Sequence, residues 1–219
     1  MTPDRRTVVD RTRAFVRERC DGEPSGHDWW HIERVCRTAV ALAREEDADL
    51  YVVELAALLH DVADWKFHGG DEEIGPRTAE SWLLSLGVDG GAVAHVCEIV
   101  RSVSFKGAGV PTPMRTREGA VVQDADRLDA LGAIGIARAF AYGGFRGDPL
   151  HDPEAEAFLA ESAATYKAHR GATINHFAEK LLLLAERMNT ESGRRLARER
   201  HAFMEQYLER FHAEWEGRA

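Results

Sequence analysis

The stretch DLYVVELAALLHD, residues 49–61, decides the fold, because it predicts a helix that is apolar on nearly every side and ends in two ionisable residues. A helix without a polar face has to be buried by its neighbours. Asp49 is placed to cap its first turn. We therefore expect this helix at the centre of a helical protein, with His60 and Asp61 at its buried end.

Helical patterns continue on both sides of this stretch. Good helix formers dominate the chain, and no run of β-branched residues shows the alternation typical of a strand. Because no linker is long or polar enough to separate two domains, we expect one all-α domain over residues 1–219. It would be a helical bundle with a metal-binding core at about 27–130 and C-terminal helices at about 154–217. Loops are expected at 105–114 and 142–149, and helices at 7–19, 27–47, 71–86, 88–104, 116–130, 131–141, 155–169, 174–189 and 193–216.

Composition narrows the class of protein. Of the 219 residues, 44% are hydrophobic and 30% are charged, a balance typical of globular proteins. Lys and Arg number 28 against 37 Asp and Glu, and the resulting net charge of −9 disfavours binding to a nucleic-acid polymer. The chain has no long apolar run and no signal-peptide pattern, so we expect a cytoplasmic protein that does not enter a membrane. Three cysteines without a CxxC pair argue against a disulfide framework or a zinc ribbon.

The pair His60-Asp61 is the sharpest chemical signal. Burying an imidazole beside a carboxylate costs several kcal/mol unless the two groups are paired or bind a metal ion. Both side chains are good ligands for divalent transition metals. The alternative is a hydrogen-bonded histidine followed by an ordinary helix end.

Further ligands are available on both sides of this pair. His31 lies next to the apolar stripe of its helix and can point inward. Downstream, Asp124 and Asp126 are two positions apart on a helix, so they point about 200° apart and cannot both reach one ion. Asp126 and Asp129 share a face. A solvated acidic face is the alternative for Asp124 or Asp129.

Taken in order, His31, His60-Asp61 and Asp126 resemble the H…HD…D signature of the HD-domain metal-dependent phosphohydrolases. The resemblance covers nearly the whole chain and looks most like the YpgQ/YedJ-like branch of that family. It is carried by the segments HDVADWK at 60–66, SFKG at 104–107, DADRLDALGAIGIAR at 124–138 and NHFAEKL at 175–181. The resemblance implies a helical HD fold and an enzyme that hydrolyses nucleoside or deoxynucleoside triphosphates to a monophosphate and pyrophosphate.

The resemblance also implies roles for single residues. Four residues match the family's metal ligands: His31, His60, Asp61 and Asp126. Asp64 falls where related enzymes carry an acid that handles the attacking water, although it could instead orient His60 or Lys66. Two-metal members carry further histidines before the final aspartate, and this chain has none between 96 and 150. We therefore expect one divalent ion, with Mn²⁺ preferred and Mg²⁺ or another first-row ion as alternatives.

A nucleotide substrate brings several negative charges into an acidic protein, so positive side chains are needed near it. Lys66 follows the HD turn directly and is assigned, with Asp64, to catalysis. Arg101, Lys106 and Arg127 flank the other motifs and are the candidates for substrate binding. For each of them a solvated surface charge is the alternative.

Other functions stay open at this point. The enzyme could hydrolyse another phosphoester, as a nucleotidase or an alarmone hydrolase does, or the fold could serve as a non-catalytic nucleotide or metal sensor. The last helix carries Phe203, Tyr207, Phe211 and Trp215, which could form the face of a homodimer or pack on the chain's own core. The roles of His27, His95 and His176 are not determined.

Overall fold

The computed structural model describes residues 3–20, 28–63 and 71–218. Within these residues the secondary structure is helical and no strand is present, which confirms the all-α prediction. The chain divides into two compact units, the first made of Met1–Phe105 and Thr112–Asp126 and the second of Lys106–Pro111 and Arg127–Ala219. The expectation of one domain over 1–219 stays a prediction.

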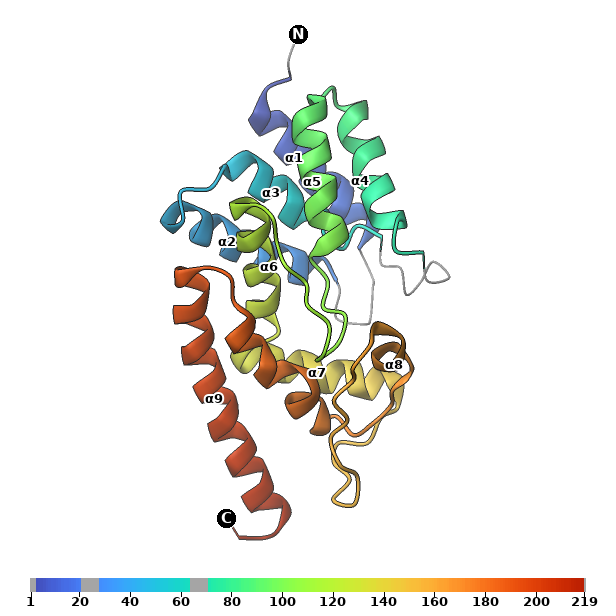
Figure 1. The fold of residues 1–219 in the computed structure, drawn as a ribbon, viewed down its shortest axis with the longest axis vertical. Helices are drawn as coiled ribbons and strands as arrows, with labels where there is room; N and C mark the ends of the chain where they lie inside the picture. The colour runs from blue at the N-terminus through green and yellow to red at the C-terminus, as the bar shows by residue number, and fades with distance from the viewer. Residues whose placement is uncertain (1–2, 21–27, 64–70, 219) are drawn as a thin grey trace. The chain divides into compact units, whose positions relative to one another are not determined.

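The first unit is built around α3 (Leu50–Leu59), which α1, α2 and α5 contact. Its side chains from Leu55 to Leu59 are fully buried, and the Asp49 carboxylate caps the first turn by accepting the Tyr51 N–H. The predicted burial of this helix is therefore confirmed. The other helices of this unit are α1 (Arg5–Arg19), α2 (Trp29–Glu45), α4 (Ile74–Ser85) and α5 (Gly90–Ser102), with most of α6 (Arg117–Asp129). Helices α4 and α5 run side by side (Figure 1).

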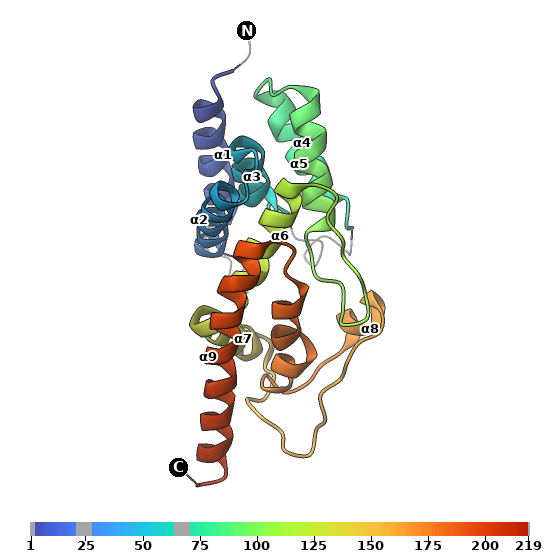
Figure 2. The same ribbon diagram turned by 60° about the vertical axis from the view of Figure 1, so that its left-hand side comes forward.

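The second unit packs its last helix, α9 (Glu191–Trp215), against α7 (Gly132–Arg146) and the turn η3 (Leu182–Arg187), as Figure 2 shows. Tyr207 stacks on Phe177, with ring centroids 6.2 Å apart, and Phe211 lies 6.3 Å from Phe140. Tyr207 and Phe211 thus pack on their own unit, one of the two alternatives for the aromatic face of α9, whereas Phe203 and Trp215 are 47% and 49% exposed. The prediction of a homodimer is not tested by this packing.

The predicted loop at 142–149 is wrong over residues 142–146, because α7 continues to Arg146. Gly143 and Gly144 do not break the helix. Gly143 instead permits a close approach, since a Cβ on it would lie 2.1 Å from the Thr173 hydroxyl. The helix ends at Gly147, which adopts the left-handed conformation (φ 73°) that favours glycine.

The predicted helix at 155–169 is also wrong, since only α8 (Ala163–Ala168) is helical there. The preceding backbone binds distant groups instead of its own next turn. The Phe158 N–H donates to the Glu179 carboxylate at 3.0 Å, and the Ala160 carbonyl accepts the Gly109 N–H at 3.1 Å. Such tertiary partners replace the bonds that helix propensity alone would predict.

The predicted helix at 174–189 is a π-helical turn, η2 (Phe177–Leu181), followed by the tighter η3. A change from a wide to a narrow turn cannot be predicted from apolar spacing of about 3.6 residues. The wide turn carries Glu179, whose buried carboxylate also lies 3.2 Å from the His169 ring.

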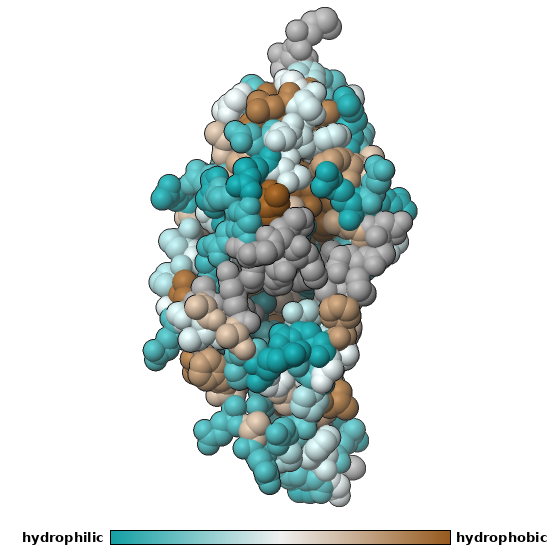
Figure 3. Space-filling model, turned by 90° about the vertical axis from the view of Figure 1, so that its right-hand side faces the viewer, coloured by the Kyte–Doolittle hydropathy of each residue, from teal (hydrophilic) through white to brown (hydrophobic). Residues whose placement is uncertain are grey.

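None of the helices in the described part of the chain combines the length and apolarity that crossing a membrane requires. On the face shown in Figure 3, the hydrophobic side chains form separate patches among hydrophilic ones.

Candidate metal centre

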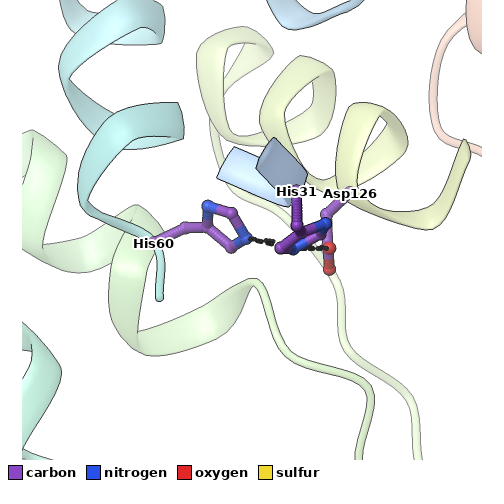
Figure 4. Close-up of side chains that lie close together, drawn as sticks. All are labelled: His31, His60 and Asp126. Carbon is purple, nitrogen blue, oxygen red and sulfur yellow. Dashed lines mark hydrogen bonds and ion pairs between the residues drawn. The ribbon is translucent and has the colours of Figure 1, made fainter. Parts of the chain in front are cut away.

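Three side chains from separate helices of the first unit meet at one point (Figure 4). His31 comes from α2, His60 follows the last residue of α3, and Asp126 lies on α6. The Nε2 atoms of the two histidines are 3.2 Å apart. Asp126 Oδ1 lies 3.6 Å from His31 Nε2 and 3.7 Å from His60 Nε2. The ring nitrogens and the carboxylate oxygen therefore face a common centre.

Asp61 adds a fourth donor atom, its second carboxylate oxygen Oδ2, to this group. Its Oδ2 atom lies 3.4 Å from His31 Nε2 and 3.5 Å from His60 Nε2. His60 and Asp61 directly follow α3, which ends at Leu59, and both side chains reach the same point.

The spacing of these atoms fits a bound divalent ion. Two donor atoms that each lie about 2.1 Å from one ion are about 3.0 Å apart at right angles and about 3.4 Å apart in a tetrahedron. The five separations measured among the histidine nitrogens and carboxylate oxygens run from 3.2 to 3.7 Å. Two imidazoles and two carboxylates form a donor set that suits first-row divalent metals.

A hydrogen bond at the end of α3 determines the tautomer of His60. Its Nδ1 atom lies 2.8 Å from the carbonyl oxygen of Ala57, and a carbonyl oxygen only accepts. Nδ1 therefore carries the proton, and the lone pair of Nε2 faces the cluster. Metal-binding histidines in proteins are commonly oriented in this way.

The cluster is buried on the histidine side and more open on the carboxylate side. The side chains of His31 and His60 are 0% and 1% exposed, whereas those of Asp61 and Asp126 are 16% and 28% exposed. His31 is held at this depth by the start of α2, where the Asp28 carboxylate accepts the His31 N–H at 2.9 Å. The capping role of Asp28 was missed in the sequence, although an aspartate three residues before His31 is a recognisable N-cap signal.

The alternative of a solvated acidic face is wrong for this helix. Asp124 and Asp129 do not form a solvated face, because Asp124 is fully buried and Asp129 is 5% exposed. Asp129 accepts a 2.9 Å hydrogen bond from the Arg138 guanidinium. Burial of Asp129 is therefore accompanied by an ion pair, as the cost of burying a carboxylate requires.

The three positively charged residues that are predicted to bind the substrate have different surroundings. Arg101 donates to both carboxylate oxygens of Glu73, and this contact raises the pKa of Arg101 and lowers the pKa of Glu73. Arg127 is almost completely buried and donates to the carbonyl oxygen of Arg187. Lys106 is half-buried in the segment that follows α5. For Arg101 and Arg127 these contacts favour a structural role.

Three predicted or open residues lie outside the described residues: Asp64, Lys66 and His27. His95 lies on α5 and contacts Thr116 and Glu118. Its Nε2 atom is 2.9 Å from the Thr116 hydroxyl and 3.7 Å from Glu118, so it contacts the beginning of α6. His95 therefore acts as a polar contact between helices.

Comparison with known proteins assigns the family. A family model described as the HD domain matches residues 29–131, the range that contains all four candidate ligands. YpgQ of Bacillus subtilis (strain 168) is 38% identical to this chain over 204 residues, which cover 91% of this chain and 90% of YpgQ. The chain belongs to the HD-domain family. It is therefore an HD-type metal-dependent phosphohydrolase, as the resemblance implied.

Solved structures resemble this HD-domain chain over almost its full length. An HD-superfamily hydrolase from Bacillus thuringiensis is 39% identical and covers 97% of this chain and 99% of its own, with a TM-score of 0.75. YpgQ in complex with ADP is 35% identical and covers 96% of this chain and 100% of its own, with a TM-score of 0.73. These similarities support the helical HD fold that the sequence predicts.

Proposed function

We propose that this HD-domain protein is a nucleoside or deoxynucleoside triphosphate pyrophosphohydrolase that releases a monophosphate and pyrophosphate. The observation that carries the proposal is the convergence of two buried imidazoles and two carboxylates, in which each histidine nitrogen lies 3.2–3.7 Å from the other and from one oxygen of each aspartate. The crystal structure of the relative YpgQ with ADP supports a nucleotide as the ligand. The segments that resemble the YpgQ/YedJ-like branch support cleavage between the α- and β-phosphates.

Four residues would hold a divalent ion, for which we propose Mn²⁺: His31, His60, Asp61 and Asp126. When bound, such an ion neutralises phosphate charge and lowers the pKa of water. The carbonyl of Ala57 holds the proton on Nδ1 of His60, which keeps Nε2 available as a donor.

The remaining catalytic roles are proposed from the sequence. Asp64 would take a proton from the attacking water, and Lys66 would neutralise charge on the phosphate oxygens. Lys106, half-buried and held in a segment with defined backbone contacts, is the described residue that we propose to bind the substrate phosphates. Arg101 and Arg127 are proposed as structural cations, because Arg101 pairs with Glu73 and the buried Arg127 donates to the carbonyl oxygen of Arg187.

The test is a panel of nucleotides assayed with Mn²⁺, Mg²⁺ or other first-row ions, with the products identified by ³¹P NMR. The proposal expects a nucleoside monophosphate and pyrophosphate, with the highest rate in Mn²⁺. Orthophosphate and a nucleoside diphosphate as the only products would refute the cleavage position. Hydrolysis of monophosphates or alarmones alone would favour the alternative phosphohydrolases.

A further inference from the structure

One side chain far away in the sequence binds two carbonyl groups of the segment Lys106–Pro111 in the second unit. The guanidinium of Arg187 donates to two successive carbonyl oxygens, through Nη1 to Gly107 at 3.2 Å and through Nη2 to Ala108. The planar guanidinium presents its donors in a rigid fork, so two neighbouring carbonyls are oriented at once.

The backbone of this segment is closely packed as well. Gly107 adopts φ 128°, a conformation that favours glycine, and a Cβ on it would lie 3.3 Å from the Ser162 carbonyl oxygen. The Gly109 N–H donates to the Ala160 carbonyl at 3.1 Å. Residues 160–162 therefore contact the backbone of Gly107 and Gly109, and Arg187 binds the carbonyl oxygens of Gly107 and Ala108.

A second arginine holds Arg187 itself. Arg127 is 5% exposed, and its Nη1 donates to the main-chain carbonyl of Arg187. Two arginines thus act in series within one unit, from Arg127 to the backbone of Arg187, and from the Arg187 side chain to Gly107 and Ala108. Arg127 directly follows Asp126 in the sequence.

We propose that Arg187 is a positioning residue that sets the backbone from which Lys106 reaches the substrate phosphates. The inference rests on the proposed function, in which Lys106 binds those phosphates. Lys106 immediately precedes the first carbonyl that Arg187 holds, so a change in the Gly107 peptide group changes the origin of the lysine side chain. A lysine at position 187 would offer a flexible point charge without the fork that holds two carbonyls.

The experiment first examines the full-length protein without metal or nucleotide. Hydrogen exchange of peptides covering residues 106–111 is compared in the wild type, Arg187→Met and Arg187→Lys. Arg194→Met is the matched control, because Arg194 also donates to two main-chain carbonyls of the same unit, those of Met188 and Asn189, both at 3.0 Å. We expect exchange at 106–111 to rise at least about tenfold in both Arg187 variants and to stay unchanged in Arg194→Met.

Steady-state kinetics then test whether Arg187 acts through Lys106. We expect Arg187→Lys and Lys106→Met each to raise KM for the triphosphate about tenfold or more, with a smaller change in kcat. The double variant should be no worse than Lys106→Met, because Arg187 acts through Lys106. Arg187→Lys keeps the charge and serves where Arg187→Met does not fold.

The possible outcomes distinguish failure of the inference about Arg187 from failure of the proposed function. Unchanged exchange at 106–111 in both Arg187 variants, or KM effects that multiply in the double variant, would overturn the inference. Wild-type protein that releases no pyrophosphate would overturn the proposed function, and the exchange experiment would still decide whether Arg187 holds the segment.

Discussion

Replacing Asp126 by alanine should abolish most of the stabilisation that a divalent ion gives this protein. Asp126 Oδ1 lies 3.6 and 3.7 Å from the two histidine nitrogens, so the change removes one of four donor atoms and one of two negative charges. The side chain is 28% exposed, so the truncation leaves little buried cavity. The effect should therefore be seen in ion binding more than in the stability of the ion-free protein.

The size of this loss in stabilisation can be worked out because an ion that binds only the folded protein raises the free energy of unfolding. An ion at one hundred times its Kd adds about 2.7 kcal/mol to the free energy of unfolding. For a chain of this length each kcal/mol raises Tm by about 2–4 °C, so the wild type should gain about 5–11 °C. Even changes outside the ligand shell can weaken metal binding 10–100-fold, so losing a ligand should cost at least about 100-fold. At the same ion concentration the variant then gains only about 0.4 kcal/mol, or roughly 1–2 °C.

Thermal unfolding with and without Mn²⁺ measures the increment in Tm that the ion causes. Competition with a fluorescent chelator gives the Kd for the ion directly. Glu118→Ala on the same helix is the control: Glu118 accepts the Asp49 N–H at 3.0 Å, so its loss lowers the basal Tm but should leave the increment intact. Asp124 is less suitable because it is fully buried. An Asp126→Ala variant with the full wild-type increment would refute the assignment of this residue as a ligand.

Leu58→Ala should lower the free energy of unfolding by about 2–5 kcal/mol in urea titrations, because Leu58 is fully buried in α3; a loss below about 1 kcal/mol would contradict the central place of this helix. Gly135→Ala should lower Tm strongly, since the new Cβ would lie 2.2 Å from the Ala130 carbonyl oxygen, whereas Gly144→Ala in the same helix has no atom within 4 Å and should gain up to about 1 kcal/mol. Equal Tm values for these two variants would show that the predicted close contact is absent. Burial, with nearby positive charges, lowers the pKa of His176 from 6.5 to about 3, so the unfolded chain binds a proton that the folded protein does not, and stability falls as the pH drops from 6.5 towards 3. His176→Asn should flatten this decline in urea titrations at successive pH values, and a curve parallel to the wild type would contradict the prediction.

Features that depend on neighbouring residues could be predicted from the sequence. The apolar stretch at 49–61 predicts a buried helix because period and hydrophobicity are local properties, and α3 has that burial. The order His31, His60-Asp61, Asp126 pointed to the HD-domain family and to residues that the structure brings together. Asp49 as a helix cap was likewise readable from its position.

The C-terminal half could not be predicted as well, because its backbone depends on distant partners. Residues 155–160 have helical composition, yet their N–H and carbonyl groups bind Glu179, Asn175 and Gly109. The glycines of α7 looked like breaks, and one of them is instead a point of close packing against Thr173. Local propensity is worth less than about 1 kcal/mol per residue, so such tertiary contacts override it.

The sequence by itself determined the helical class, the buried central helix and the residue types that could hold a metal ion, since these follow from local pattern and resemblance. Only the tertiary structure decided that Asp124 and Asp129 are buried, that Arg101 pairs with Glu73, and that Arg127 and Arg187 hold backbone carbonyls. A charged side chain has the same chemistry in every sequence context, and its role depends on which groups surround it. Those groups come from residues 9 to 80 positions away, and only folding brings them within hydrogen-bond distance.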